Sequence, residues 1–425
     1  MEFTFIHAAD IHLDSPLRGL EKYEGAPVEK IRNATREAFQ HLVDVAIERN
    51  VAFLVIAGDL YDGDWKDYNT GLFFISQMSR LQKENIKVFL IRGNHDAANL
   101  ITKELKLPEN VIEFSVDKPE TFIMEELQVA LHGQGFASRA VTENIAKAYP
   151  SKMEGYVNIG LLHTSATGRE GHESYAPCSL DDLKEKGYDY WALGHIHLRE
   201  VLHEKNPVII FPGNIQGRHI KETGQKGCTI VTVKDGQIHH YEHQDLDVLR
   251  WEVCSVDASS CETVQDIVIT AREKLEELYQ DSEGRFLAIR IRITGSTDAH
   301  QALLVDREHV INNLRSLALE VGYGDIWIEK VKIETTRKMD IEELREKSSP
   351  IASILDYIEG LSQNEEIFEL LLQEFKDLQS ALPNELKSGE DAFDFSNPTI
   401  LTNRLKEVEE LILHYLTTKS GVETA

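Results

Sequence analysis

Residues 86–96 read IKVFLIRGNHD, so an apolar run passes almost directly into a cluster of polar residues. The run IKVFLI is typical of a buried strand, whereas glycine, asparagine and aspartate are poor strand residues. A turn after the strand explains Gly93 and Asn94. It does not explain why an imidazole, His95, and a carboxylate, Asp96, follow at once. The question is therefore whether other strands of this chain end in the same way.

Four further apolar runs end in the same kinds of side chain. They end in Asp10 and His12, in Gly58-Asp59-Leu60-Tyr61-Asp62, in His163, and in Gly194-His195-Ile196-His197. In open α/β sheets, ligands collect outside the carboxyl ends of the strands. We therefore expect these polar groups, although distant in sequence, to converge on one place.

The mixture of side chains indicates a metal centre. Carboxylate, carboxamide and imidazole ligands without a thiolate suit Mn²⁺, Fe²⁺ or Zn²⁺. The candidate ligands are Asp10, His12, Asp59, Asn94, His163, His195 and His197. They are too many for one tetrahedral ion, but they suffice for two ions that share a bridging carboxylate. The pattern therefore predicts two divalent ions, which lower the pKa of water and neutralise phosphoryl oxygens.

The order of the elements predicts an α/β protein. Strand and helix patterns alternate from residue 2 to residue 96, which favours parallel strands buried on both faces. The following stretch is richer in strands and contains an Asp235-Gly236 hairpin signal. We predict a layered domain with two sheets over 1–245, a small α/β domain over 248–338, and a helical region over 340–425. Within that last region, helices are expected at 340–379 and 399–418, with a loop at 380–398.

Composition restricts the class of protein. The chain has 425 residues, with 42% hydrophobic and 28% charged residues and a net charge of −27. No apolar run approaches the length of a membrane span, and the four cysteines show no paired metal-ligand spacing. We expect a cytoplasmic protein that makes no membrane contact. The negative charge weakens, without excluding, a nucleic-acid substrate, because such proteins usually carry a basic surface.

The five polar blocks carry a family resemblance. In order they read D-x-H, G-D-x-x-D, G-N-H-D, H and G-H-x-H, as in the calcineurin-like metallophosphoesterases. Within that superfamily, AADIHLDSPL, GDLYD, FLIRGNHD, LGHIHL and FPGN resemble the SbcD-type DNA-repair exonucleases, in their YhaO-like bacterial branch. The resemblance implies a four-layer α/β/β/α sandwich, a small α/β capping domain and C-terminal helices.

The resemblance also implies a role for each site residue. Asp10, His12, Asp59 and His197 would hold the first ion, and Asp59, as bridge, with Asn94, His163 and His195 would hold the second. His95 would face the substrate and protonate or stabilise the leaving oxygen. Asp62 would orient His95 through a hydrogen bond. Asp62 follows the bacterial pattern, whereas archaeal and eukaryotic repair nucleases tend to have a histidine at that position.

Several other features are open to two interpretations. Arg218, His219 and Lys221 follow the last ligand-bearing strand, so they either contact substrate or lie on the surface. Arg290 and Arg292 share one face of a strand, where a solvated surface is favoured over phosphate contact. The resemblance implies that the C-terminal helices bind an SMC-like coiled-coil ATPase. It also implies a homodimer, for which GLFFISQM (71–78) offers apolar residues, although packing against the chain's own core explains that segment equally well.

The main functional hypothesis is a two-metal phosphodiesterase that hydrolyses DNA. The resemblance implies Mn²⁺ as the favoured ion and 3′-directed exonuclease activity, and it leaves open an additional endonuclease activity. A second hypothesis is a phosphoesterase for small or non-DNA substrates, because one metal centre serves many substrates. A third is a partner-binding component that retains its metal site. The complete set of ligands argues against the third hypothesis.

Overall fold

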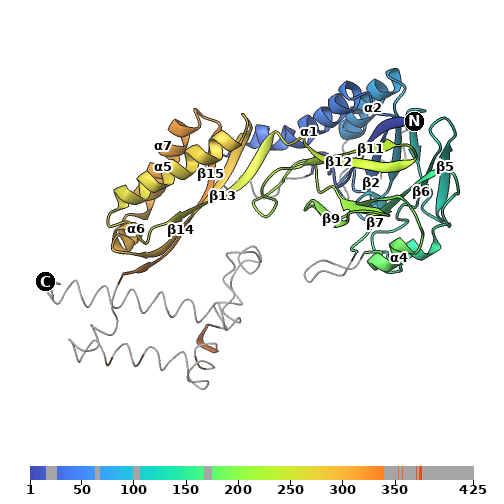
Figure 1. Ribbon diagram of the computed structural model, residues 1–425. Helices are drawn as coiled ribbons and strands as arrows, with labels where there is room; N and C mark the ends of the chain where they lie inside the picture. Colours follow the sequence, from blue (N-terminus) through green and yellow to red (C-terminus); the bar gives the residue numbers. More distant parts are fainter. Residues whose placement is uncertain are drawn as a thin grey trace. The chain divides into compact units, whose positions relative to one another are not determined.

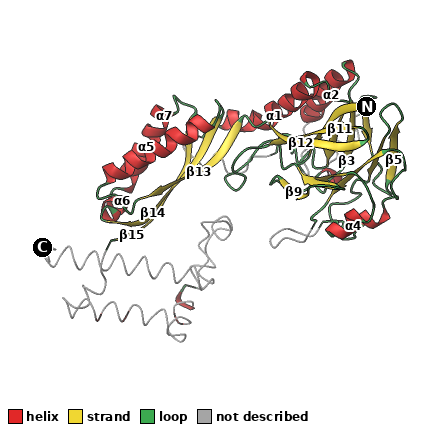
Figure 2. Cartoon of the chain, in the orientation of Figure 1, coloured by secondary structure: helices red, strands yellow, loops and turns green. Residues whose placement is uncertain are grey.

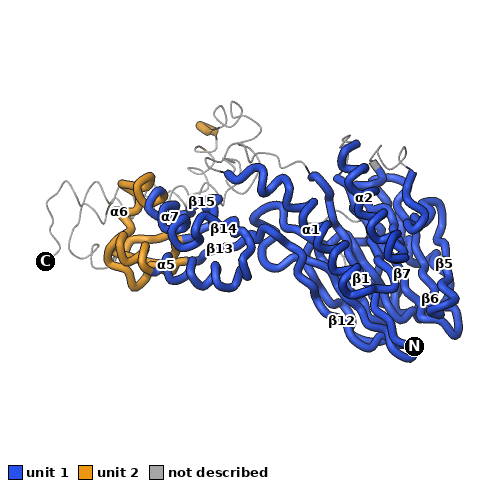
Figure 3. Tube along the Cα trace, turned by 90° about the horizontal axis from the view of Figure 1, so that it is seen from above, with its two compact units in different colours: residues 1–255, 270–292, 312–332 blue, residues 256–269, 293–311, 333–425 orange. Residues whose placement is uncertain are grey.

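The computed structural model describes residues 1–15, 26–62, 68–98, 106–166 and 175–338, together with Ser353, Tyr357, Leu370 and residues 373–375. The chain divides into two compact units. One comprises residues 1–255, 270–292 and 312–332, and the other residues 256–269, 293–311 and 333–425 (Figure 3). Apart from those isolated positions, the region expected to be helical at 340–425 lies outside the described residues, and so does the loop at 380–398.

The first sheet has the strand order β12-β11-β1-β2-β3-β4. Its strands are β1 (Glu2–Ala8), β2 (Phe53–Ala57), β3 (Lys87–Ile91), β4 (Val111–Glu113), β11 (Gly227–Lys234) and β12 (Gln237–Asp245). Strands β1 to β4 run parallel, whereas β11 is antiparallel to both β1 and β12. The hairpin between β11 and β12 turns at Asp235 and Gly236, whose φ angles of 52° and 76° confirm the predicted tight turn.

Helices α1 (Val28–Glu48) and α2 (Tyr68–Lys83) cover the outer face of this sheet (Figure 1). The buried residues of α1 recur at helical spacing and include Ile31, Phe39, Leu42, Val43 and Ala46. Most of them pack with Ile6, Leu54 and Val88 in one apolar cluster, so the helix is fixed by its apolar face rather than by a capping side chain.

The second sheet has the strand order β5-β6-β7-β8-β10-β9. Its strands are β5 (Glu120–Met124), β6 (Val129–Gly133), β7 (Val157–His163), β8 (Tyr190–Gly194), β9 (Glu200–His203) and β10 (Val208–Phe211). Between the two sheets lies an apolar core that includes Phe5, Phe89 and Tyr190. The opposite face of the second sheet packs, through Trp191, against α4 (Leu180–Lys184) and the 3₁₀ helix η3 (Ile145–Ala148). The four-layer α/β/β/α sandwich is therefore confirmed.

The remaining elements form a three-stranded sheet with the order β13-β14-β15. Its strands are β13 (Leu249–Asp257), β14 (Phe286–Thr297) and β15 (Ile326–Arg337), and the helices between them are α5 (Val264–Asp281), α6 (His300–Val305) and α7 (Arg307–Val321) (Figure 2). Along the chain the order is therefore strand, helix, strand, two helices and strand.

One expectation for β14 is half wrong. Arg292 is exposed, as a solvated face requires, but Arg290 is buried. The guanidinium of Arg290 donates to both carboxylate oxygens of Glu329, at 2.8 and 2.9 Å. The ion pair satisfies the buried charge, which explains how an arginine is accommodated there.

Candidate metal centre

The ends of five strands from both sheets supply the polar side chains. Asp10, Asp59 and Asn94 follow β1, β2 and β3 of the first sheet, whereas His163 ends β7 and His195 follows β8 of the second. The centre therefore lies at one edge of the sandwich, where the carboxyl ends of parallel strands meet. No helix in the described ranges is both long and apolar enough to cross a bilayer.

Glycines allow the two sheets to approach closely at this edge. A Cβ atom on Gly194, at the end of β8, would collide with the carbonyl oxygen of Ala57, at the end of β2. A Cβ on Gly58 would collide with the imidazole of His163, and the φ of +93° at Gly58 also favours glycine. The glycines that precede the ligands are thus required by the approach of the sheets.

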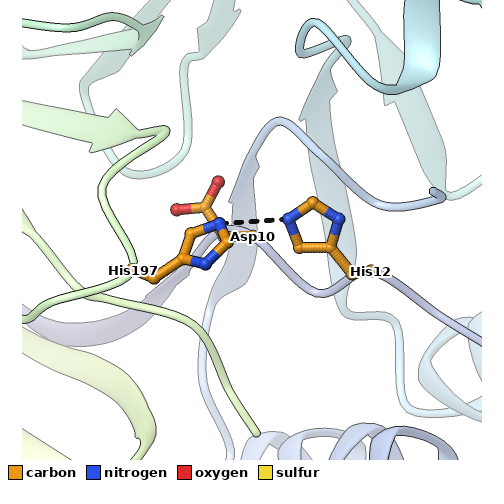
Figure 4. A group of neighbouring side chains, drawn as sticks. All are labelled: Asp10, His12 and His197. Atoms are coloured by element: carbon orange, nitrogen blue, oxygen red, sulfur yellow. Dashed lines mark hydrogen bonds between the residues drawn. The ribbon is translucent and has the colours of Figure 1, made fainter. Parts of the chain in front are cut away.

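The first group of ligands consists of Asp10, His12 and His197, and is called the Asp10 cluster below (Figure 4). One potential ligand atom from each lies within 4.8 Å of the others. The Nε2 atoms of His12 and His197 lie 3.2 Å apart and face each other. The backbone N–H of His195 donates to both oxygens of Asp10, at 2.9 and 3.0 Å, which joins the end of β1 to the end of β8.

The second group consists of Asp59, His163 and His195, with Asn94 beside it, and is called the Asp59 cluster below. His163 donates from Nδ1 to the carbonyl oxygen of Ala57, at 3.0 Å. In the neutral imidazole its Nε2 lone pair then faces two oxygens: Asn94 Oδ1 at 2.9 Å and Asp59 Oδ2 at 3.4 Å. A proton on Nε2, or a cation in its place, would hold these three electron-pair donors together.

Asp59 lies between the two clusters. Its Oδ1 accepts a hydrogen bond from the backbone N–H of His95 at 2.9 Å, which fixes the carboxylate. Its Oδ2 lies 3.8 Å from Nε2 of His12 in one cluster and 3.4 Å from Nε2 of His163 in the other. A single carboxylate oxygen therefore faces an imidazole of each cluster, which is the geometry that a bridging ligand requires.

The protonation equilibria reflect this crowding of buried groups. Burial raises the pKa of Asp10 to about 6, and burial lowers the pKa of His12 to about 3. Burial alone would raise the pKa of Asp59, but the neighbouring His163 outweighs it and holds that pKa below its usual range. Burial opposes protonation of His163, yet the charge of Asp59 raises its pKa to about 9. The protein without ions thus places a positive charge beside Asp59, where a bound cation would replace it.

Four ligand residues have backbone conformations that are unusual for L-amino acids. Asp10, His12, Asp59 and His195 have φ angles of 51°, 48°, 53° and 103°. Such conformations cost about 1–3 kcal/mol each and persist where the surrounding structure imposes them. Together with the facing lone pairs, this donor set fits two divalent ions, and the seven predicted ligands are the residues that would hold them.

His95 and Asp62 lie next to the Asp10 cluster. Nδ1 of His95 is 2.7 Å from Oδ1 of Asp62, and the side chains are 28% and 18% exposed. Potential ligand atoms of His12, Asp62 and His95 lie within 4.8 Å of one another. His95 therefore combines a fixed carboxylate partner with access to solvent, as a group that meets substrate must.

The three residues predicted as substrate contacts are in different environments. The guanidinium of Arg218 turns towards the centre, with Nη1 3.9 Å from Asp62 Oδ2 and Nη2 3.4 Å from His197 Nδ1. The side chain of His219 is 54% exposed, and Lys221 is exposed. The structure thus brings Arg218, but not Lys221, to the ligands.

Two buried carboxylates at the centre were not predicted. Asp96 accepts hydrogen bonds from the backbone N–H groups of Tyr61 at 2.8 Å and Gly93 at 2.9 Å, so it joins the loops after β2 and β3. Glu222 lies 2.6 Å from Nδ1 of His197. Asp96 is the last residue of the G-N-H-D block, so its place in the sequence could have indicated a role at the centre. Glu222 is 25 positions from His197 in an irregular loop, and no periodicity relates the two.

Comparison with known proteins agrees with this geometry. The calcineurin-like phosphoesterase model matches residues 3–199, and the middle domain of metallophosphoesterase YhaO matches residues 251–336. The metallophosphoesterase YhaO of Bacillus subtilis is 37% identical over 298 residues, which cover 69% of this chain and 72% of the relative.

More distant relatives are DNA double-strand break repair proteins Mre11. The Sulfurisphaera tokodaii protein is 23% identical, and the match covers 72% of this chain and 77% of the relative. The Archaeoglobus fulgidus protein is 22% identical, and the match covers 87% of this chain and 84% of the relative. A solved dimetal phosphatase from Danio rerio is 11% identical to this chain, and the match covers 55% of this chain and 93% of that one with a TM-score of 0.33. The match to YhaO is extensive, and the structure contains groups of side chains that could hold metal ions. This chain belongs to the calcineurin-like metallophosphoesterases and is a metal-dependent phosphoesterase.

Proposed function

We propose that this phosphoesterase hydrolyses the phosphodiester bonds of DNA with two divalent ions, as a repair nuclease of the SbcD type. The observation that carries the two-ion proposal is the position of Asp59 Oδ2 between His12 and His163, at 3.8 and 3.4 Å. Two-ion centres in phosphodiesterases hold their metals about 3.5–4 Å apart, so that one carboxylate oxygen can bind both. We further propose Mn²⁺ as the native ion, because the resemblance to the SbcD-type nucleases implies it, although the same set of ligands also suits Fe²⁺ and Zn²⁺.

The other parts of the reaction would be carried out by side chains of the protein. When bound, the ions would supply water of lowered pKa and neutralise charge on the phosphoryl oxygens. His95 donates from Nδ1 to Asp62, which leaves its Nε2–H for the oxygen that departs from phosphorus. Arg218, whose side chain is 16% exposed, lies on the Asp62 side of the centre and adds positive charge near that oxygen. These assignments make His95 the general acid and Asp62 the residue that positions it.

DNA is proposed as the substrate for two reasons. Relatives named as DNA double-strand break repair proteins align with more than two thirds of this chain. The matched region in the Archaeoglobus fulgidus relative covers 87% of the chain, so the likeness extends beyond the phosphoesterase fold. We propose 3′-directed exonuclease activity, with endonuclease activity as the alternative mode of cleavage.

The net charge of −27 favours a second candidate, a phosphoesterase for small or non-DNA substrates. DNA binding gains much of its affinity from cationic groups that displace counterions. A small phosphoester needs only the centre itself, whereas a duplex must approach a negatively charged protein. Turnover of duplex DNA therefore has to be compared with turnover of a small phosphodiester.

The test is cleavage of a 3′-labelled and a 5′-labelled duplex by Mn²⁺-loaded protein, beside hydrolysis of bis-p-nitrophenyl phosphate. Metal-dependent labelled products that disappear in Asp59→Asn and His95→Ala would support a DNA nuclease, and their lengths would give its direction. Hydrolysis of the small diester without any cleavage of DNA, with or without an ATPase partner, would reject DNA as substrate. Inactivity towards both would favour a partner-binding component with a retained metal site.

Partners are proposed on the same basis. The region 340–425 would bind an SMC-like coiled-coil ATPase, and deletion of residues 380–425 should then abolish co-purification with such an ATPase. A homodimer through α2 is supported by Tyr68 and Leu72, which are 52% and 55% exposed and lie one helical turn apart. The free cysteines Cys178, Cys228, Cys254 and Cys261 are all buried, which is compatible with the proposed cytoplasmic location.

A further inference from the structure

His197 has a carboxylate partner on the side of its ring away from the Asp10 cluster. Its Nδ1 lies 2.6 Å from Oε1 of Glu222, and its Nε2 faces Nε2 of His12 at 3.2 Å. Glu222 is 7% exposed, and its Oε1 also lies 3.4 Å from Nη2 of Arg218, which places a positive charge beside the carboxylate. The ionised carboxylate accepts the Nδ1–H of His197, so the Nε2 lone pair points into the cluster.

Glu222 is itself held by groups that can only donate. Its Oε2 accepts from the backbone N–H of Arg218 at 2.8 Å and from Nδ2 of Asn214 at 3.0 Å. The carbonyl oxygen of Gln216 accepts from the same Nδ2 of Asn214 at 2.8 Å, which identifies that atom as the donor nitrogen. Oε2 is therefore bonded to the loop, whereas Oε1 accepts from the His197 ring and also from Nη2 of Arg218 at 3.4 Å.

The Asp59 cluster is built differently. The corresponding bond of His163 is to a neutral carbonyl oxygen, that of Ala57. A backbone carbonyl fixes the tautomer without adding charge, whereas a carboxylate also makes the imidazole a stronger ligand. The two clusters thus differ in what supports their histidines, and a change at Glu222 should affect the Asp10 cluster alone.

We propose that Glu222 is a positioning residue for His197, which fixes the ring and its tautomer and so sets the affinity of the Asp10 cluster for its ion. The inference rests on the proposed two-ion function and deepens it. It predicts unequal ion sites: loss of the Glu222 charge weakens one of them and leaves the other unchanged.

Glu222→Gln separates this role from a general effect on the fold. The amide must place its NH₂ group either towards the two donors, Arg218 N–H and Asn214 Nδ2, or towards His197. The first orientation sets the NH₂ group against two donors at 2.8 and 3.0 Å, whereas the second sets it against one more distant donor, Nη2 of Arg218 at 3.4 Å, so the second is favoured. His197 must then accept at Nδ1 and carry its proton on Nε2, where a metal ion would bind. The loop keeps its hydrogen bonds while the ligand loses its lone pair.

The experiment counts bound Mn²⁺ by electron paramagnetic resonance during titration of the full-length metal-free protein, and compares the parent, Glu222→Gln and a control. Glu320→Gln is the matched control. Glu320 lies in helix α7 and forms an exposed ion pair with Arg272, so the substitution removes the same charge from a surface position. For Glu222→Gln we expect one ion at parental affinity and a second bound about 10–100-fold more weakly. The signal of two magnetically coupled ions should disappear at stoichiometric Mn²⁺, while Tm of the metal-free protein stays at the parental value.

Parental affinity for both ions in Glu222→Gln would overturn the proposal. Equal weakening of both ions, or a lowered Tm without metal, would also overturn it, because Glu222 would then act on the fold as a whole. A parent that binds fewer than two ions would refute the two-ion function and the inference together. If the parent binds two ions and cleaves no DNA, the DNA proposal fails, whereas selective loss of one ion in the variant would still support the role of Glu222.

Discussion

Asp62 Oδ1 lies 2.7 Å from Nδ1 of His95, and Asp62 Oδ2 accepts from the hydroxyl of Ser15 at 2.5 Å. Burial alone would raise the pKa of Asp62, but the neighbouring imidazoles of His12 and His95 hold it well below its usual range. Burial lowers the pKa of His95, and the bond to Asp62 more than compensates, so that pKa is raised overall. The pair therefore keeps a proton on an imidazole that is open to solvent, which is the arrangement of a general acid.

Replacement of His95 by alanine should slow phosphodiester cleavage without loss of metal. General acid catalysis contributes about 10²–10⁴-fold, so kcat should fall by that factor. Bound Mn²⁺ should be unchanged, because only the backbone N–H of residue 95 contacts Asp59. Single-turnover cleavage and metal titration of the same preparations measure the two effects.

The control is His240→Ala, which removes a surface imidazole on β12 that is 60% exposed. Cleavage by the control should match the parent. If His95→Ala cleaves at the parental rate, the general-acid assignment is wrong, and if it loses metal, His95 is a ligand rather than an acid.

Asp62→Asn should retain the orientation of His95 but remove the charge behind it. The amide oxygen still accepts from Nδ1 of His95, and the Ser15 hydroxyl can rotate to accept from the new NH₂ group. We expect a loss of about 10–100-fold in kcat, smaller than that of His95→Ala. The double variant should be no slower than His95→Ala, since Asp62 acts through His95. If kcat of the double variant falls by the product of the two single-variant factors, Asp62 acts independently of His95.

Gly194→Ala should destabilise the sandwich at the point where the sheets meet. The new methyl group would overlap the carbonyl oxygen of Ala57, and overpacking of this kind costs at least about 1–3 kcal/mol. Both ion sites should weaken, because Asp10, His163 and His195 are held across this junction. Urea unfolding and metal titration would measure the two losses.

Gly155→Ala is the control for that substitution. Gly155 has a φ of +83° but nothing within 4 Å of an added Cβ, so it reports the cost of backbone conformation without a collision. It should lower stability by about 1 kcal/mol and leave metal binding intact. Parental metal affinity in Gly194→Ala would show that the close approach of the sheets is not what positions the ligands.

His7 should make the metal-free protein less stable in acid. Its Nε2 lies 3.1 Å from the carbonyl oxygen of Leu193 and its Nδ1 2.9 Å from the Tyr190 hydroxyl, as expected for a satisfied core histidine. Burial lowers its pKa from 6.5 to about 3. Below pH ~6.5 the unfolded chain binds a proton that the folded chain does not, so stability falls as pH drops towards 3.

The slope from one such group is at most about 1.4 kcal/mol per pH unit. Urea unfolding between pH 7 and 4 in EDTA should therefore show a steeper loss for the parent than for His7→Gln. Other titrating groups are common to both proteins and cancel in the difference. Parallel pH dependences would mean that His7 does not resist protonation in the folded state.

The sequence by itself determined the elements and the ligand types. Apolar runs with period-two or helical spacing depend on neighbours a few residues away, so α1, the β11–β12 hairpin and the parallel strands β1 to β3 could be read from local patterns. The five polar blocks identified Asp10, Asp59 and His163 as ligand candidates because each block follows its own strand. Each of these features depends on residues that are close together in the chain, so it can be recognised from the sequence alone.

Only the tertiary structure decided which distant groups meet. The 2.6 Å pairing of Glu222 with His197 joins an irregular loop to a strand end, and the burial of Arg290 depends on Glu329 in another strand. The approach of Gly194 to Ala57 depends on two sheets that share no hydrogen-bonded strand. Such contacts follow from how packed layers close on one another, because packing energy depends on the summed shape of many side chains rather than on any short pattern.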